Sequence, residues 1–345
     1  MTSDSDVLIG VDVGSTTVAG GLVTRQGEVL SALEAGTKLG SGTVVATILD
    51  IVTALVGEAS RRALSVEAVG VGVPGLVDRE RGAMVASAGS ILADLQGISL
   101  VERVAAKTGL PTFVDNDVNA LALGEWTFGA GRGAASCVVI AIGTAVGAGI
   151  IVDGQLVRGA GGYAGELGHV SIDFDGPPCR CGGRGCLSLY LGGDLLAAEA
   201  RRRIVREPSN MLALARGDLA AITAETVFAA AAQRDGLAGA MVERACRALG
   251  AGLALVVNGL NPEVIVVTGG VVKSLLPLRA EIARRTQEYA LAEVLAGTAI
   301  HLIPGEKRQT VRGGAALVLH ELARGAAGRR DTMVAPAVKT AGDRR

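Results

Sequence analysis

A histidine and three cysteines stand close together between residues 165 and 188, in GELGHVSIDFDGPPCRCGGRGCLS. They are His169, Cys179, Cys181 and Cys186. One imidazole and three thiolates can close a tetrahedral zinc shell, and a cytoplasmic chain seldom uses cysteines as disulfides. A closed shell leaves no position for water, so we predict a structural Zn²⁺ that holds this loop and fixes Glu166 and His169 at a cleft wall. The alternative is three unrelated thiols in a glycine-rich loop.

Two segments repeat one pattern, an apolar strand, a small Gly/Thr turn, a second apolar strand, a polar turn and a third strand. They are VLIGVDVGSTTVAGGLVTRQGEVL at 7–30 and CVVIAIGTAVGAGIIVDGQLV at 137–157. The match indicates an internal duplication of one β-hairpin unit. Backbone N–H groups of such turns form anion-binding nests, so two facing nests could clamp a polyphosphate. The alternative is that these glycines only make turns, and the absence of GxxxxGK[ST] excludes a P-loop.

Further periodic segments indicate the layers that carry these turns. Apolar residues have helical spacing at 43–64 and 226–257, and the apolar runs at 68–74 and 263–270 are typical of buried strands. Strands alternating with helices imply an α/β fold, and two similar halves imply a cleft between them. The uncharged run at 134–152 is as long as a membrane span, but its glycines, valines and isoleucines favour a buried strand–turn–strand.

Composition limits the class of protein. The 345 residues have room for about two domains, and 49% hydrophobic with only 2% aromatic residues implies an aliphatic core. A net charge of −1 argues against a nucleic-acid surface, and the polar start MTSDSD has no secretory signal. We therefore expect a cytoplasmic enzyme without nucleic-acid or membrane partners, in which Cys137 and Cys246 are inert core residues.

Several motifs together resemble the ROK family (repressors, open reading frames and kinases), and within it the glucokinase-like sugar kinases. They are DVGSTTVAGGLV (12–23), VGVGVPGLVD (69–78), FVDNDVNALALGEWTFGAG (113–131), IGTAVGAGII (142–151), GELGH with CRCGGRGC, and VIVVTGGVV (264–272). The resemblance spans roughly 7–322, and no helix-turn-helix precedes Val7, which favours the kinase type.

This resemblance implies two actin/hexokinase-like, ribonuclease H-like α/β domains with a cleft between them. Residues 1–120 plus about 311–323 would form the small N-terminal domain, and 121–310 the large domain with the zinc loop. We expect a disordered tail at 324–345. The family's habit also implies a homodimer or higher homo-oligomer.

The resemblance assigns roles to individual positions. Asp117 would be the general base that takes the proton of a sugar hydroxyl as its oxygen attacks the γ-phosphate of ATP. Asp12 would hold Mg²⁺ through water. The substrate would contact Asn116, Asp117, Glu166, His169 and position Ser188, and the nucleotide would contact Gly14, Ser15, Thr16, Thr17, Gly143, Thr144, Gly269 and Gly270. The alternative for residues 115–117 is a polar turn after a strand.

The chain also departs from the family pattern. Ser15 and Thr17 replace the second glycine and the lysine of D-x-G-G-T-K, so a positive charge near the phosphates is missing. Ser188 replaces a glutamate that serves the anomeric end of the ring, and SILADL (90–95) lacks the usual asparagine and tryptophan. We predict transfer to a primary hydroxyl of a hexose or hexose-like polyol. Glucose and a C7-cyclitol are alternative acceptors, and a non-catalytic sugar-sensing regulator is the alternative of another class.

Overall fold

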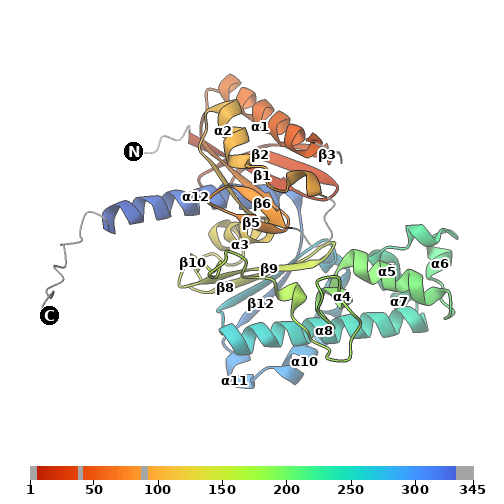
Figure 1. Ribbon diagram of the computed structural model, residues 1–345. Helices are drawn as coiled ribbons and strands as arrows, with labels where there is room; N and C mark the ends of the chain where they lie inside the picture. The colour runs from red at the N-terminus through yellow and green to blue at the C-terminus, as the bar shows by residue number, and fades with distance from the viewer. Residues whose placement is uncertain (1–5, 38–41, 87–91, 332–345) are drawn as a thin grey trace, which may run out of the picture.

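Two five-stranded sheets form the framework of the computed structural model, which describes residues 6–37, 42–86 and 92–331 (Figure 1). The strands of the first sheet are β1 (Asp6–Val13), β2 (Thr17–Thr24), β3 (Val29–Gly36), β4 (Ser65–Val73) and β7 (Thr112–Asn116). Those of the second are β8 (Cys137–Ile142), β9 (Val146–Val152), β10 (Gln155–Leu156), β11 (Val264–Gly269) and β12 (Ala299–Pro304). A separate hairpin pairs β5 (Leu76–Asp78) with β6 (Ala83–Ala86).

The two sheets have the same topology, in the orders β3-β2-β1-β4-β7 and β10-β9-β8-β11-β12. In each, an antiparallel three-stranded meander at one edge continues into two parallel strands. This agreement confirms the duplication that the sequence predicts, including the strand–turn–strand at 134–152.

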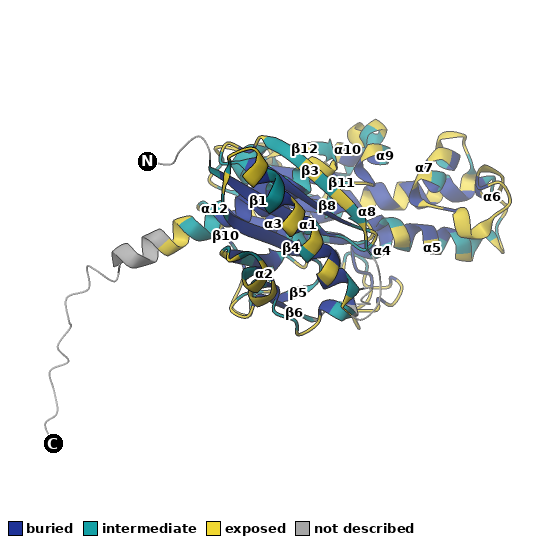
Figure 2. Ribbon diagram, turned by 90° about the horizontal axis from the view of Figure 1, so that it is seen from above, coloured by how far each residue is buried: buried dark blue, intermediate teal, exposed yellow. Residues whose placement is uncertain are grey.

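Helices cover both faces of each sheet. They are α1 (Thr43–Arg61), α2 (Leu100–Thr108), α3 (Asp117–Phe128), α4 (Ser188–Leu191), α5 (Gly193–Ile204), α6 (Met211–Leu214), α7 (Ala224–Ala232), α8 (Gly236–Leu260), α9 (Val272–Leu275), α10 (Arg279–Tyr289), α11 (Ala292–Leu295) and α12 (Lys307–Asp331). Short 3₁₀ turns lie at η1 (Ala93–Leu95), η2 (Leu167–His169), η3 (Leu219–Ala221) and η4 (Leu276–Leu278). Figure 2 shows the inner strands of the sheets buried, whereas the edge strands β3 and β12 and the outer helices carry half-buried and exposed residues.

One prediction about helices is wrong. The single helix expected over 226–257 is two, because Arg234 adopts a φ of 64° and Asp235 caps α8 by accepting a hydrogen bond from the N–H of Ala238. The start of the tail expected at 324–345 is drawn as helix, since α12 continues to Asp331, and the prediction of disorder for the tail as a whole stays a prediction. Its remainder, 332–345, lies outside the described residues, as do positions 90 and 91 of the SILADL segment.

The alternation of side chains along β1 fixes which residues meet which helix. Its odd-numbered residues pack with α1 and α2, whereas Leu8 packs with Val311 and its neighbours on α12. Gly10 lies on the face of Leu8, and a Cβ there would stand 1.9 Å from the carbonyl oxygen of Val311. Asp12, two residues further along the same face, is therefore directed toward the start of α12.

The helices α3 and α12 lie between the two sheets. Leu121 and Leu123 of α3, with Leu317 of α12, pack against β8 and β11. The opposite surface of α12 covers the first sheet, so this helix belongs to both cores. The proposed domain boundary at residue 120 falls within α3, and the proposed return at 311–323 falls within α12.

Within the described residues, α1 is the one helix that has the length and apolar composition of a membrane span. Its apolar residues, such as Ile48, Val52 and Leu55, pack on the first sheet. A buried apolar face on a helix is what a globular core produces, so the packing accounts for its composition.

Candidate functional site

Each meander places a short Gly/Thr turn at the same end of its sheet. In the first, the N–H of Gly14 donates to the carbonyl of Thr17 at 2.9 Å; in the second, the N–H of Gly143 donates to Ala145 at 3.0 Å. Both first glycines therefore close their turns. A Cβ at Gly143 would meet no atom within 4 Å, so open space adjoins the second turn.

Asp12 lies at the end of β1, beside the first turn. Burial raises the pKa of its carboxyl group, while a hydrogen bond from Thr310 and the positive charge of Lys307 oppose that rise. Lys307 also donates a hydrogen bond to the hydroxyl of Thr17. The cation that the first motif lacks is thus supplied from the start of α12.

The segment after β7 forms the head of α3. The side-chain oxygen of Asn116 accepts hydrogen bonds from the N–H groups of Val118 and Asn119, at 2.9 and 3.2 Å, and its amide nitrogen donates to the carbonyl of Gly75 at 3.0 Å. Asn116 is therefore the N-cap of α3. This cap fixes the backbone of the next residue, Asp117, which is the predicted base.

Asp117 has the electrostatics of a residue that can exchange a proton near neutral pH. Burial, then the neighbouring charges of Asp12 and Glu166, raise its pKa to about 7, against a weaker opposing effect from the N–H of Val118. The carboxylates of Asp12 and Glu166 thus both act electrostatically on Asp117. Burial and like charges together are typical of a catalytic carboxylate.

A buried ion network stands behind the catalytic segment. The carboxylate of Asp115, only 1% exposed, accepts hydrogen bonds from Arg158 at 2.8 Å and from the side chain of Asn119 at 3.0 Å. Arg158 also pairs with Glu321 of α12 at 2.6 Å, and Arg79 joins Glu321 at 2.9 Å. These contacts tie the end of β7 to the second sheet's loops and to α12, which holds the head of α3 in place.

The predicted zinc ligands converge. The ligand atoms of His169, Cys179, Cys181 and Cys186 all lie within 4.8 Å of one another. Nδ1 of His169 is 3.8 Å from the sulfur of Cys179, and the sulfurs of Cys181 and Cys186 are 3.6 Å apart. Ligands at ~2.1–2.3 Å from one tetrahedral zinc ion stand about 3.5–3.8 Å apart, so the four residues fit this metal. Nε2 of His169 remains on the other edge of the ring.

The GELGH segment lies tightly on β9. A Cβ at Gly165 would stand 2.1 Å from the carbonyl oxygen of Ala148, and one at Gly168 would stand 1.9 Å from that of Val146. Both glycines allow the backbone to approach the strand. The close approach brings Glu166 near Asp117 while His169 reaches the cysteines.

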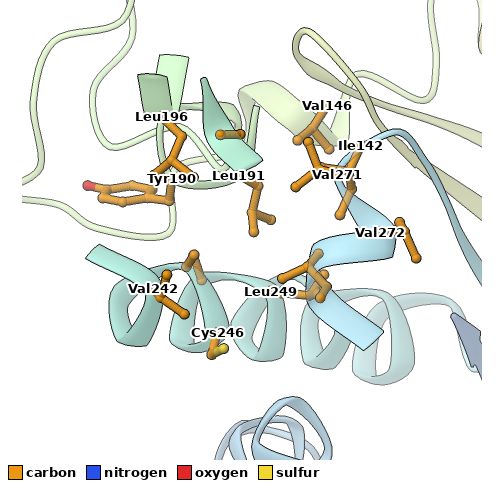
Figure 3. Packing of buried hydrophobic residues seen from close by; sticks show 14 of the residues in the cluster. Ile142, Val146, Tyr190, Leu191, Leu196, Val242, Cys246, Leu249, Val271 and Val272 are labelled. Carbon is orange, nitrogen blue, oxygen red and sulfur yellow. The ribbon is translucent and has the colours of Figure 1, made fainter. Parts of the chain in front are cut away.

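A hollow of about 340 Å³ adjoins the second turn. Its lining includes Gly143, Thr144, Gly193, Asp194, Arg201, Thr223, Glu225 and Gly270. Gly269, at the neighbouring turn, has a φ of 112°, and a Cβ there would stand 2.4 Å from the carbonyl oxygen of Ile142. Figure 3 shows the apolar support of this region, where Ile142, Val146 and Val271 gather above Leu249 of α8.

Comparisons with known proteins identify the family. The model of the ROK family matches residues 8–321. The chain belongs to the ROK family. A glucokinase of Halalkalibacterium halodurans is 34% identical over 90% of this chain and 94% of its own length, and one of Streptomyces coelicolor is 37% identical over 76% and 81%.

Solved ROK structures share the fold. A ROK family glucokinase from Streptomyces griseus in complex with glucose and AMPPNP is 33% identical, with a TM-score of 0.75 over 90% of this chain and 98% of that one. A ROK family transcriptional regulator, a homologue of the E. coli MLC protein, is 28% identical, with a TM-score of 0.79 over 94% and 81%. The actin/hexokinase-like fold class is therefore confirmed.

One predicted site residue of this ROK protein is placed differently. Ser188 is 1% exposed, and its hydroxyl accepts a hydrogen bond from the N–H of Val146 at 3.1 Å. The side chain is short enough to turn inward and tie α4 to β9. In this structure the Ser188 hydroxyl is engaged with β9, and a substrate contact at this position stays a prediction.

The sequence motifs did not single out five residues near the candidate site. They are Lys307, Thr310, Asp194, Arg201 and Glu225. Lys307 lies 290 positions from Thr17, and no local spacing connects the two. The packing of α12 on the first sheet, which contains β2 and Thr17, brings them together.

Proposed function

We propose that this ROK protein is an ATP-dependent kinase that transfers the γ-phosphate to a primary hydroxyl of a hexose or hexose-like polyol. The observation that carries the proposal is Asp117, whose pKa is raised to about 7 beside Asp12 and Glu166. The similarity to glucokinases over nearly their whole length supports the same reaction class. The proposal includes a cytoplasmic location and a homo-oligomer, as expected from the sequence and family.

The nucleotide would bind between the two Gly/Thr turns. The hollow beside Gly143 and Thr144 offers room for the nucleoside part, and Gly269 and Gly270 let it approach the backbone closely. Its phosphates would then extend toward Gly14, Ser15, Thr16 and Thr17. The related S. griseus glucokinase was solved with glucose and the ATP analogue AMPPNP, which is consistent with this arrangement.

Asp12 is the residue best suited to hold Mg²⁺ through water. Its carboxylate is half-buried with a raised pKa, so a divalent cation would satisfy a charge that its surroundings disfavour. Bound Mg²⁺ would neutralise charge on the transferred phosphoryl group. Asp12, at the end of β1, is well placed to position that ion beside the first turn.

Asp117 would act on the acceptor. Its carboxylate takes the proton of the primary hydroxyl, the hydroxyl oxygen bonds to the γ-phosphorus, and the bond from that phosphorus to the β-bridging oxygen breaks to release ADP. Asn116 already serves as a helix cap, so we assign its main role to fixing Asp117, with any sugar contact secondary. Glu166 and Nε2 of His169 would receive the remaining hydroxyls.

The identity of the acceptor depends on the wall near position 188. The inward-turned Ser188 leaves no carboxylate there to bind the anomeric end, so demands at that end should be relaxed. Glucose, mannose, N-acetylmannosamine and a C7-cyclitol with a primary hydroxyl are therefore the acceptors to compare.

An ADP-release assay with these acceptors tests the proposal. We expect saturable turnover with at least one, and ³¹P NMR of the product should show a phosphate ester on a primary carbon. A regulator would instead show sugar binding in a calorimetric titration and no turnover with any acceptor. The similarity to the ROK transcriptional regulator is the observation that keeps this second function in the test.

A further inference from the structure

The phosphate side of the nucleotide site carries little positive charge of its own. Neither turn segment, 12–17 or 143–147, contains a lysine or an arginine. A nucleoside triphosphate brings several negative charges, and enzymes that transfer its γ-phosphate commonly add a side-chain cation to the metal ion. Such a cation has to come from another segment of the chain.

The connection between β12 and α12 contacts both the turn at Gly269 and the first Gly/Thr turn, which begins at Gly14. Gly305 donates its N–H to the carbonyl of Gly269 at 3.2 Å, and a Cβ at Gly305 would stand 2.8 Å from the Cα of Gly269. Two residues later, the ammonium group of Lys307 donates to the hydroxyl of Thr17. Within three residues, this connection touches both ends of the predicted phosphate path.

Lys307 is also electrostatically part of the site. Its charge lowers the pKa of Asp12, although burial makes that pKa higher overall. Its hydrogen-bond partner is the neutral hydroxyl of Thr17. A phosphate oxygen carries a negative charge and would form a stronger hydrogen bond with the ammonium group than this hydroxyl does. The flexible side chain can therefore exchange this hydroxyl for a phosphate oxygen.

We infer that Lys307 binds the terminal phosphates of the nucleotide from the first turn of α12. The inference rests on the proposed kinase function and adds a phosphate-binding residue to it. In the nucleotide-free protein, the hydrogen bond to Thr17 holds the ammonium group of Lys307 near the site. Because α12 packs against both sheets, a phosphate held by Lys307 would be fixed relative to both halves of the molecule.

Isothermal titration calorimetry with Lys307→Met tests this. We expect ATP and ADP to bind about 10- to 100-fold more weakly, as for loss of one charge-assisted contact, while adenosine binds as it does to the wild type. The matched control is Lys107→Met, which removes an exposed lysine of α2 and should change neither. The double variant Thr17→Lys with Lys307→Met returns a cation from the other side and should recover part of the ATP affinity.

The outcomes separate the two hypotheses. Unchanged ATP affinity in Lys307→Met overturns the inference alone, as does an equal loss of adenosine binding, which would mean that the residue only supports the fold. A wild type that binds no ATP overturns the kinase function together with the inference. Thermal unfolding without ligand should show similar Tm values for all variants.

Discussion

The two Gly/Thr turns are copies of one unit, yet their surroundings differ. Two residues before the turn glycine, the first copy has Asp12 and the second has Ala141. The first turn faces Lys307 at the start of α12, whereas the carbonyl of Gly143 in the second accepts a hydrogen bond from Gly193 at 2.7 Å. Duplication thus supplied two equal scaffolds.

The neighbours of each turn decide what it can bind. Charged groups gather at the first turn, which suits phosphates and a metal ion. The second turn adjoins a hollow whose lining includes Asp194, Arg201 and Glu225 and which rests on an aliphatic core, so it offers both polar partners and room for the nucleoside part of a nucleotide. The proposed reaction needs both, with Asp117 facing the charged side.

The strongest disruption should come from Asp117→Asn. The amide cannot accept the hydroxyl proton, so we expect kcat to fall at least ~100-fold with ATP affinity largely kept. At pH 8 the wild type keeps a charged carboxylate in a buried position, and the neutral amide removes the cost of burying that charge, so Tm should not fall. Steady-state kinetics and calorimetry check both parts. Wild-type turnover would refute the assignment of the base.

Loss of zinc should have the second-largest effect on activity, since residues 165–188, which hold the predicted zinc ligands, lie against β9 of the second sheet. Cys181→Ala should abolish metal binding, loosen residues 165–188 and raise the KM for the acceptor more than that for ATP. Elemental analysis should give one zinc per chain in the wild type and none in the variant. Cys246→Ala, in the core of α8, is the control that should keep the metal. Metal-free wild type from chelator-free purification would exclude the site.

Gly143→Val separates the two turns. Its side chain would enter open space, so the fold should tolerate it, but the added methyl groups would occupy the nucleotide hollow. We expect ATP to bind about tenfold more weakly, the scale of a 1–3 kcal/mol steric penalty. Fluorescence titration with a labelled ATP analogue measures it. Equal ATP affinity would move the nucleotide away from the second turn.

The pH dependence of kcat/KM tests the protonation state of Asp117. Because the pKa of Asp117 is raised to about 7, the base is protonated at lower pH, and kcat/KM should rise about tenfold per unit up to pH 7. Folded protein holds this proton more tightly than unfolded protein, so Asp117 lowers stability as pH rises from about 4 to 7. Asp117→Asn should flatten that part of the stability profile. A kcat/KM independent of pH between 5 and 7 would contradict this.

Ser188→Ala should have the smallest effect. It leaves the buried N–H of Val146 without its hydroxyl partner, which costs about 1–3 kcal/mol of folding free energy. Because the Ser188 hydroxyl is buried against β9, we expect kcat to stay unchanged. Denaturant unfolding and the kinetic assay measure the two quantities. A lowered kcat at full stability would return Ser188 to the substrate wall.

The sequence predicted what local patterns determine. The duplicated hairpins, the convergence of His169, Cys179, Cys181 and Cys186, and the position of Asp117 at a strand end followed from spacing and motif. Two results depend on packing between distant elements. Lys307 meets Thr17 through the packing of α12 on the first sheet. The Ser188 hydroxyl reaches Val146 in a space that a Cβ at Gly168 would enter, since that atom would stand 2.5 Å from the hydroxyl oxygen. The break between α7 and α8 depended on one residue with positive φ, Arg234.

The dependence of the first sheet on α12 has a consequence for synthesis on the ribosome. Leu8 and Ala68 are made early, but the residues that cover them, Val311, Ala315 and Val318, come near the end of the chain. At ~5–20 residues per second, this face of the sheet waits roughly 15–60 seconds for its cover. During that interval, the nascent N-terminal half presents a bare apolar surface. We expect it to be a chaperone client until α12 has left the exit tunnel.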